Sequence, residues 1–173
     1  PRTRGNLREV HHRPGVLGGD QAEIVEFYEY DDGMGGCCGS NFVIKATDGR
    51  GNVTLHTYDT QGNRLSTTQA IVTAVDSWEY NGFGQMTAHV LPDNGSSHRR
   101  RDQFAYYPAG PQMGYLQTQT VDSTGLALTT TYEYDAVGNV IRTIDPRGHD
   151  TLFTRNALNQ IVREQSREVT TGS

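Results

Sequence analysis

Residues 129–148 read TTTYEYDAVGNVIRTIDPRG. Residues 129–134 are β-branched or aromatic except for Glu133. Such a run favours a half-buried strand whose successive side chains point to opposite faces. Residues 135–138 then place an Asp at the start of a turn and a Gly where the chain needs positive φ. Residues 139–144 return as a second strand, and residues 145–148 repeat the turn with Pro in a position that its fixed φ suits. One strand-turn-strand-turn unit is therefore contained in this stretch.

The same turn recurs along the chain at regular intervals. Its starts at 48 and 59 are 11 residues apart, and those at 122, 135, 145 and 156 are 13, 10 and 11 apart. Turns at such spacing leave strands of about six residues, which is typical of an antiparallel meander. The predicted turn residues are Asp48, Gly51, Asp59, Gly62, Asn81, Gly84, Asp122, Gly125, Asp135, Gly138, Asp145, Gly148, Asn156 and Asn159.

The spacing predicts an all-β fold, a long antiparallel meander of hairpins in a curved or spiralling sheet. No helical period competes with the alternation, and no linker divides the chain, so residues 1–173 are expected to form one segment. The strands are expected at 5–10, 22–30, 42–47, 53–58, 64–68, 71–80, 86–91, 103–107, 115–121, 129–134, 139–144, 151–155 and 161–164.

Composition narrows the function classes. The hydrophobic share is 34% and the mean hydropathy is -0.64, which predicts a turn-rich sheet with one well-covered face. A net charge of -5 argues against nucleic acid as a partner, because phosphate binding needs clustered Lys and Arg. The basic run at residues 99–101 is expected to be a solvated loop. No apolar run reaches the ~18 to 20 residues of a membrane span.

The repeated pattern Tyr-x-Tyr-Asp-x-x-Gly-Asn carries a family resemblance. It is clearest at residues 132–139, is echoed at 58–63 and is followed by Asp-Pro-Arg-Gly at 145–148. In these motifs the chain resembles the Rhs or YD-repeat family, which includes bacterial Rhs polymorphic toxins, the B and C components of Tc toxins, and the teneurin extracellular shell. The resemblance implies a sheet that spirals into a hollow shell. Such a shell is secreted or lies at the cell surface, and it encloses a toxin segment or presents a surface for cell contact.

The chain departs from the family pattern at one motif. Family shells end in a self-cleaving aspartyl site in which Asp-Pro-x-Gly leads into a Gly-Gly stretch, whereas residues 145–148 continue as His-Asp-Thr-Leu. We therefore expect no self-cleaving site here.

Both ends fall inside a repeat, which predicts exposed edge strands that pair with flanking YD repeats or with further copies of the chain.

The aspartates invite a catalytic or a calcium-binding interpretation, since paired carboxylates serve acid and base roles and oxygen-rich turns ligate Ca²⁺. Their regular place at turn starts favours a structural one, in which the side chain accepts nearby backbone N–H groups. No EF-hand loop, metal-ligand His spacing, nucleophile motif or phosphate-binding loop occurs. We expect no enzyme activity, no cofactor and no metal.

The aromatic residues admit two interpretations. On one face of a sheet they could stack on sugar rings of a glycan or receptor, or they could hold neighbouring strands together as a cross-strand ladder. The ladder is favoured because a Tyr precedes the turn in unit after unit. The strand aromatics are Tyr30, Tyr58, Trp78, Tyr80, Tyr106, Tyr132 and Tyr134.

Cys37 and Cys38 are adjacent, so they cannot join distant strands. They could form a strained vicinal disulfide, bind a soft metal, or sit in a small-residue loop packed on a shell face, and the last is favoured.

The function expected from the sequence is structural: a segment of a secreted or surface YD-repeat β-shell that encloses or displays a toxin or effector. The alternative is an adhesive module that binds glycans or cell-surface receptors through exposed aromatic residues.

Overall fold

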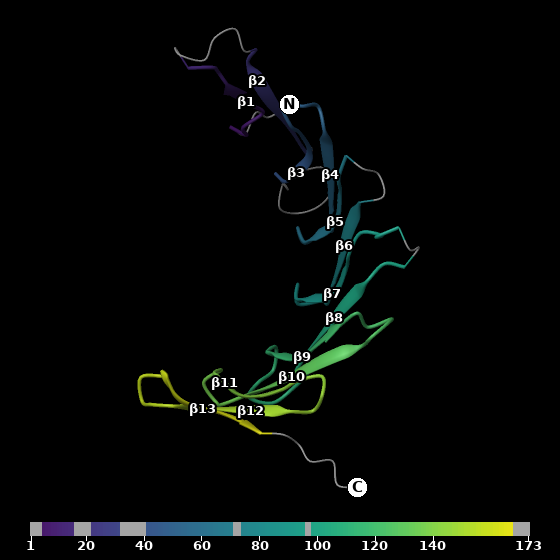
Figure 1. Ribbon diagram of the computed structural model, residues 1–173. Coiled ribbons are helices and arrows are strands. Elements are labelled where there is room, and N and C mark those ends of the chain that lie inside the picture. The colour runs from purple at the N-terminus through teal and green to yellow at the C-terminus, as the bar shows by residue number, and fades with distance from the viewer. Residues whose placement is uncertain (1–4, 16–21, 32–40, 71–73, 96–97, 168–173) are drawn as a thin grey trace. The chain divides into compact units, whose positions relative to one another are not determined.

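The computed structural model describes residues 5–15, 22–31, 41–70, 74–95 and 98–167. These residues form thirteen β-strands, and none of them lies in a helix. The sheet order is the chain order from β1 to β13, so each strand neighbours the strands before and after it in sequence (Figure 1). All the strand pairs that the register defines are antiparallel. The predicted all-β antiparallel meander is confirmed.

The strand bounds follow the turns closely. The strands are β1 (Glu9–His12), β2 (Ile24–Tyr30), β3 (Val43–Thr47), β4 (Val53–Tyr58), β5 (Arg64–Thr68), β6 (Val75–Tyr80), β7 (Met86–Val90), β8 (Arg101–Tyr106), β9 (Leu116–Val121), β10 (Leu128–Tyr134), β11 (Val140–Ile144), β12 (Asp150–Arg155) and β13 (Ile161–Arg167).

Two strands differ from expectation by several described residues, and the expected start of the strand at 71–80 falls on residues 71–73, outside the described residues. Strand β1 begins at Glu9 rather than at residue 5, because its partners are Ile24 to Phe27 of β2. Strand β13 runs to Arg167 rather than ending at residue 164, because Gln165 and Ser166 stay paired with β12 despite their polar side chains. Cross-strand pairing thus sets these ends where hydrophobicity alone does not.

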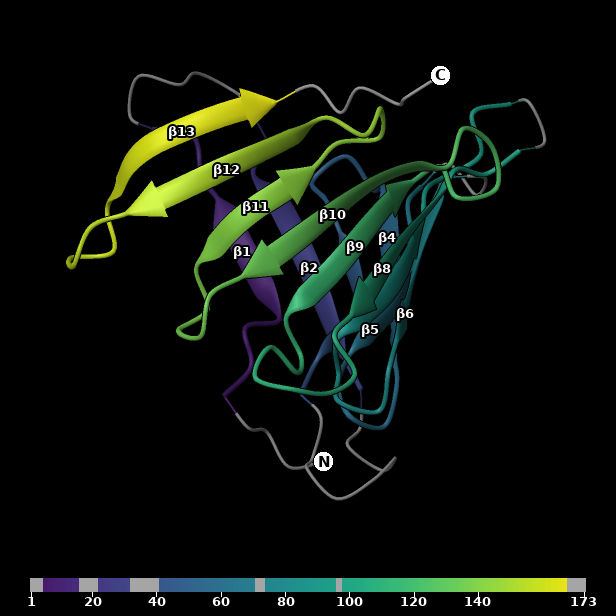
Figure 2. The ribbon, with the colours of Figure 1, turned by 90° about the horizontal axis from the view of Figure 1, so that it is seen from below.

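Two compact units divide the chain. The first comprises Pro1–Gln85 and Val90–Arg99, and the second comprises Met86–His89 and Arg100–Ser173. Strands β1 to β6 pair in order within the first unit. In the second, β8 to β13 pair in order, and β9 to β13 lie side by side (Figure 2).

The strands bury few side chains completely. Among the described residues, Ala88 is the one fully buried hydrophobic side chain, and the buried polar residues are Asp102 and Asp150. Most strand residues are half-buried. Stability must therefore come from ladder hydrogen bonds and from contacts between neighbouring strands rather than from a thick core.

Five hairpins contain a β-bulge at the same position. The register shifts at the last residue of the outgoing strand, so that Tyr134 pairs with Val140 while Glu133 pairs with Arg142, and Ile141 is skipped. An extra residue on one strand bends that strand and increases its twist. The shifts lie at Glu29/Tyr30, Thr57/Tyr58, Ala105/Tyr106, Glu133/Tyr134 and Thr154/Arg155.

Candidate functional site: the repeated turn and the tyrosine at its base

The turn headed by Asp135 shows the local geometry of the repeat. The backbone N–H of Asp135 donates to the carbonyl of Asn139 at 3.0 Å, and the N–H of Gly138 donates to the carbonyl of Asp135 at 3.3 Å. Oδ1 of Asp135 also accepts the N–H groups of Val137 and Asn139 at 3.0 and 2.9 Å. One carboxylate oxygen thus satisfies two backbone donors that the turn leaves without ladder partners.

Five further turns repeat this pattern. They are headed by Asp48, Asp59, Asn81, Asp145 and Asn156. The fourth residue of each turn has positive φ, between 59° and 93°, which favours Gly and tolerates Asn. These residues are Gly51, Gly62, Gly84, Gly138, Gly148 and Asn159.

In five of the six turns the residue that closes the turn is chemically matched to the residue that opens it; at Asp145 the closing residue is His149, whose Nδ1 lies 3.6 Å from Oδ2. In the other three turns that Asp opens, an Asn side-chain amide donates to its Oδ2, as Asn139 does to Asp135 at 2.9 Å. Where Asn opens it, the closing residue is Gln, whose Oε1 accepts instead, as in Asn81 to Gln85 at 2.9 Å. A carboxylate only accepts, whereas an amide also donates, so each opening residue needs a different partner. The matched pairs are Asp48 with Asn52, Asp59 with Asn63, Asn81 with Gln85, Asp135 with Asn139 and Asn156 with Gln160.

These contacts lower the pKa of the turn carboxyls. The amide of the closing Asn is the first cause for Asp48, Asp59 and Asp135, and backbone N–H groups add to it. For Asp145 the first cause is the backbone N–H of His149. Hydrogen bonds to a carboxylate favour its charged form. The geometry therefore holds these groups ionised and bonded to the backbone.

The turn at Asp122 differs from the predicted geometry. Positive φ falls on Asp122 itself, at 53°, and on Ala127, at 49°, rather than on Gly125. The N–H groups of Gly125 and Ala127 both donate to the carbonyl of Asp122, at 3.0 and 2.8 Å. A Cβ on Gly125 would lie 2.4 Å from a carboxylate oxygen of Asp122. Gly125 is needed because that side chain approaches closely and not because of its own φ.

A tyrosine hydroxyl at the base of the turn joins three strands. Tyr134 pairs with Val140 of β11 through its backbone, and its hydroxyl donates to the carbonyl of Leu116 in β9 at 2.9 Å. The same hydroxyl contact reaches the start of the preceding strand, or the residues just before it, at four other sites. These are Tyr30 to Leu7 at 2.8 Å, Tyr58 to Val43 at 3.1 Å, Tyr80 to Arg64 at 3.0 Å and Tyr106 to Met86 at 2.7 Å.

An arginine takes the tyrosine position in the last hairpin. Arg155 ends β12, and its Nη2 donates to the carbonyl of Val140, the first residue of β11, at 3.4 Å. Its Nη1 also donates to the carbonyl of Asn159 in the turn, at 2.9 Å. The position thus requires a long side chain with a terminal donor, and either residue type provides one.

The other two predicted aromatics make different contacts. The Tyr132 hydroxyl donates to Oε1 of Gln119 at a long 3.4 Å. Trp78 lies beneath the guanidinium of Arg64, whose central carbon is 5.0 Å from the ring centroid, which is a cation–π contact.

Neighbouring turns on one edge of the sheet touch each other. The Tyr115 ring lies against Gly138, where an added Cβ would be 2.7 Å from the hydroxyl oxygen. The Asn139 amide donates to Oδ1 of Asn159 in the next turn, at 3.3 Å. Phe42 lies in the same way against Gly62, within the first unit. In these three places the residue before a returning strand contacts the positive-φ residue of a neighbouring turn.

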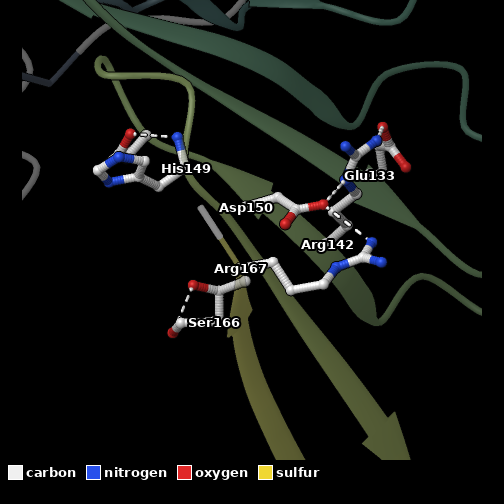
Figure 3. A network of polar contacts seen from close by, with 8 residues as sticks. Glu133, Arg142, His149, Asp150, Ser166 and Arg167 are labelled. Carbon is white, nitrogen blue, oxygen red and sulfur yellow. Dashed lines mark hydrogen bonds and ion pairs between the residues drawn. The ribbon is translucent and has the colours of Figure 1, made fainter. Parts of the chain in front are cut away.

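The buried carboxylate of Asp150 in β12 binds arginines of the two neighbouring strands. Asp150 accepts from Nε of Arg142 at 3.0 Å and from Nη2 of Arg167 at 3.2 Å, and Arg142 also donates to Glu133 at 2.9 Å (Figure 3). Asp150 is 3% exposed. Burial raises the pKa of Asp150, but the hydrogen bonds and charges of Arg167 and Arg142 outweigh burial and lower that pKa below its usual value. No sequence motif had pointed to this network, since its members lie on separate strands.

The basic run at residues 99–101 is only in part the solvated loop that the sequence suggested, because Arg101 begins β8 and Arg99 is half-buried, whereas Arg100 is exposed. Arg99 donates to the carbonyls of Leu91 and Val90 at 2.9 and 3.2 Å. Arg100 binds both oxygens of buried Asp102 at 2.9 and 2.7 Å. The Arg100 contact is the first cause that lowers the pKa of Asp102. These guanidinium groups are engaged by the fold, which leaves less of their charge for a phosphate.

The contacts described above are hydrogen bonds, ion pairs and ring contacts within the sheet. The part of the chain that the structure describes holds no group of three or more His, Cys, Asp or Glu side chains placed to bind a metal ion. Nor do its residues form a helix with the length and apolar character that crossing a membrane requires. Cys37 and Cys38 lie outside the described residues.

Comparison with known proteins finds similar folds among Tc toxin structures. A crystal structure of TcdB2-TccC3 without its hypervariable C-terminal region matches 83% of this chain with a TM-score of 0.64 and 17% identity. The crystal structure of TcdB2-TccC3-Cdc42 matches 83% with a TM-score of 0.61 and 18% identity. A mutant Tc holotoxin pore of Photorhabdus luminescens matches 82% with a TM-score of 0.61 and 19% identity.

These matches are limited in length and in sequence. The chain spans 7% of the length of each of these Tc toxin chains. No family model matches its sequence, and no curated protein matches it. At such identity the likeness shows the fold: this chain shares an antiparallel meander with part of the Tc toxin complexes.

Proposed function

We propose that this chain is a structural segment of a secreted or cell-surface YD-repeat shell, which encloses or displays a toxin or effector and catalyses nothing itself. The observation that carries the proposal is the meander itself, in which matched turn residues and strand-joining side chains recur hairpin after hairpin. The fold likeness to TcdB2-TccC3 supports the same interpretation. Its partners would be flanking repeats and the enclosed segment.

The tyrosine contacts favour a structural role in the wall of the shell over an adhesive role. At five of the predicted sites the hydroxyl is bonded to a backbone carbonyl of the sheet. A hydroxyl engaged in this way holds strands together and is less available to a sugar or receptor. The aromatic side chains thus contribute to the wall, as the ladder interpretation expects.

Protease protection tests the proposal. The protein as its gene encodes it, with any flanking repeats, is treated with a broad protease, and the cleavage sites are mapped by mass spectrometry. We expect a non-repeat segment to be protected in the native protein and to be cut faster when Tyr134→Phe and Asp135→Ala weaken the wall together. Thr60→Ala, at an exposed turn tip, is the matched control and should leave protection unchanged.

Two results would argue against a shell. One is that every non-repeat segment is cut equally fast in the native and weakened proteins. The other is glycan-array binding that disappears on Tyr132→Ala, which would favour the adhesive module.

A further inference from the structure

The β1–β2 hairpin carries a cluster of titratable side chains that the turn and tyrosine contacts do not explain. Both ring nitrogens of His11 face carboxylates: Nε2 lies 3.1 Å from Glu9 and Nδ1 lies 3.1 Å from Glu23. On the same hairpin, Nε2 of His12 lies 3.4 Å from Glu26. Arg13 donates to Glu23 at 2.9 Å.

The geometry at His11 requires a particular protonation state. A neutral imidazole donates from one nitrogen only, so its other nitrogen would place a lone pair against a carboxylate oxygen. Both contacts are favourable only when His11 carries two ring protons and a positive charge. The placement of the two carboxylates therefore favours the imidazolium.

We propose that the β1–β2 hairpin is a pH-sensitive part of the sheet, which is held closed while His11 is protonated and loosens when that proton is lost. Strand β1 pairs with β2 in antiparallel register, and the side-chain contacts of the hairpin add to that pairing (Figure 1). Loosening β1 exposes the backbone donors and acceptors of β2 to a pairing strand. The inference does not depend on the proposed function.

The charges that face the histidines favour this direction. From β1 and its flanks come Glu9 and Arg13, and from β2 and its flank come Glu23 and Glu26. Glu26 also accepts from the Tyr28 hydroxyl at 2.7 Å, whereas Glu29, farther along β2, is paired with Lys45 of β3. With His11 neutral, Glu9 and Glu23 face one arginine, Arg13, and like charges then oppose closure.

The sign follows from the direction of the shift. The hydrogen bond to Glu9 and the charge of Glu23 raise the pKa of His11 above its usual value. A group whose pKa is raised on folding contributes stability that is complete below the unfolded pKa, about 6.5, and that is lost as the pH rises through the folded pKa. The hairpin is therefore tighter in mild acid than in mild base.

Hydrogen exchange of the intact chain tests the proposal. Protection factors, corrected for the intrinsic pH dependence of exchange, are compared for residues 9–12 and 161–167 at about pH 5.5 and about pH 8. We expect protection of β1 to fall about fivefold at the higher pH, as for two exposed ion pairs, and that of β13 to stay the same. The double variant His11→Gln/His12→Gln should lose the pH dependence, whereas His56→Gln, on β4, should keep it.

A titration of His11 by NMR decides the case if the double variant does not fold. The expected midpoint lies above about 6.5 and falls in Glu9→Gln/Glu23→Gln. Equal β1 protection at the two pH values, or a His11 midpoint at or below about 6.5, would overturn the proposal.

Discussion

The side-chain amide of Asn139 donates to Oδ2 of Asp135 at 2.9 Å, so the residue that closes the turn is bonded to the residue that opens it. The opening residue in turn holds two backbone N–H groups through its other oxygen. The turn is thereby fixed by a single side chain that its neighbour orients. This relationship makes the first residue of the turn the one whose loss should matter most.

Asp135→Ala tests that expectation. The variant removes three accepted hydrogen bonds at a half-buried site, where water replaces part of each one. We expect the melting temperature to fall by about 2 to 6 °C. Val137→Thr at the exposed tip is the control and should leave melting unchanged within about 1 °C. Equal melting of the two variants would show that the side chain of Asp135 is not what holds the turn.

The turns that begin with Asp should respond to acid, and those that begin with Asn should not. Because folding lowers the pKa of Asp48, Asp59 and Asp135, their contribution is complete above the unfolded pKa, about 3.9, and is lost as the pH falls through the lower folded values. Corrected amide protection should therefore decrease in acid at these turns and not at the turns headed by Asn81 and Asn156.

A double substitution isolates the cause of that acid response. Asp135→Asn with Asn139→Gln converts one turn to the donor and acceptor pair found at Asn81 and Gln85. The variant should remain folded and lose the acid response at this turn alone. Persistence of the response there would show that another group carries it.

The strands and turns could be predicted because their determinants are local. An Asp or Asn followed by Gly or Asn at the fourth position fixes six of the turns, and β-branched residues fill the stretches between them. The bulges could not be predicted, since a register shift depends on which residues face each other across two strands. The geometry at Asp122 was also missed, because its backbone N–H donates to Asp102 of another strand at 2.9 Å.

The polar contacts likewise include some whose residues the sequence indicated and others that it did not. The tyrosines were visible as a repeated residue type, but their hydroxyl acceptors lie on the preceding strand and have no motif. In the last hairpin Arg155 replaces that tyrosine, so the repeated residue type is lost although the contact is kept. The Asp150 network combines residues from β10 to β13, which the meander alone brings together.

Tyr134→Phe measures the worth of the hydroxyl contact. The change deletes a 2.9 Å hydrogen bond to the Leu116 carbonyl and leaves the ring in place. We expect the free energy of unfolding to fall by about 1 kcal/mol in urea denaturation, with an unchanged slope. Tyr132→Phe, whose contact is 3.4 Å long, should cost less. If Tyr132→Phe costs as much or more, the hydroxyl of Tyr134 has no special role.

Asp150→Asn tests the buried network. The variant leaves two arginines facing a neutral amide in place of a buried carboxylate. Because both arginines reach solvent, we expect an intermediate cost, a melting temperature lower by about 3 to 6 °C. Glu133→Gln removes the exposed contact of the same Arg142 and should lower melting by about 1 °C. A reversed order would place the weight of the network at its exposed end.

Two glycines separate backbone strain from side-chain contact. Gly138 and Gly148 both have positive φ, 93° and 85°, but an added Cβ meets the Tyr115 ring at Gly138 and nothing within 4 Å at Gly148. Gly148→Ala should therefore cost about 1 kcal/mol of unfolding free energy, from backbone conformation alone. Gly138→Ala should cost about 1 kcal/mol more, because Tyr115 must move away from the turn. Tyr115→Ala in the Gly138→Ala background should remove the difference, and if the two glycine variants are equally stable, the contact between neighbouring turns contributes nothing.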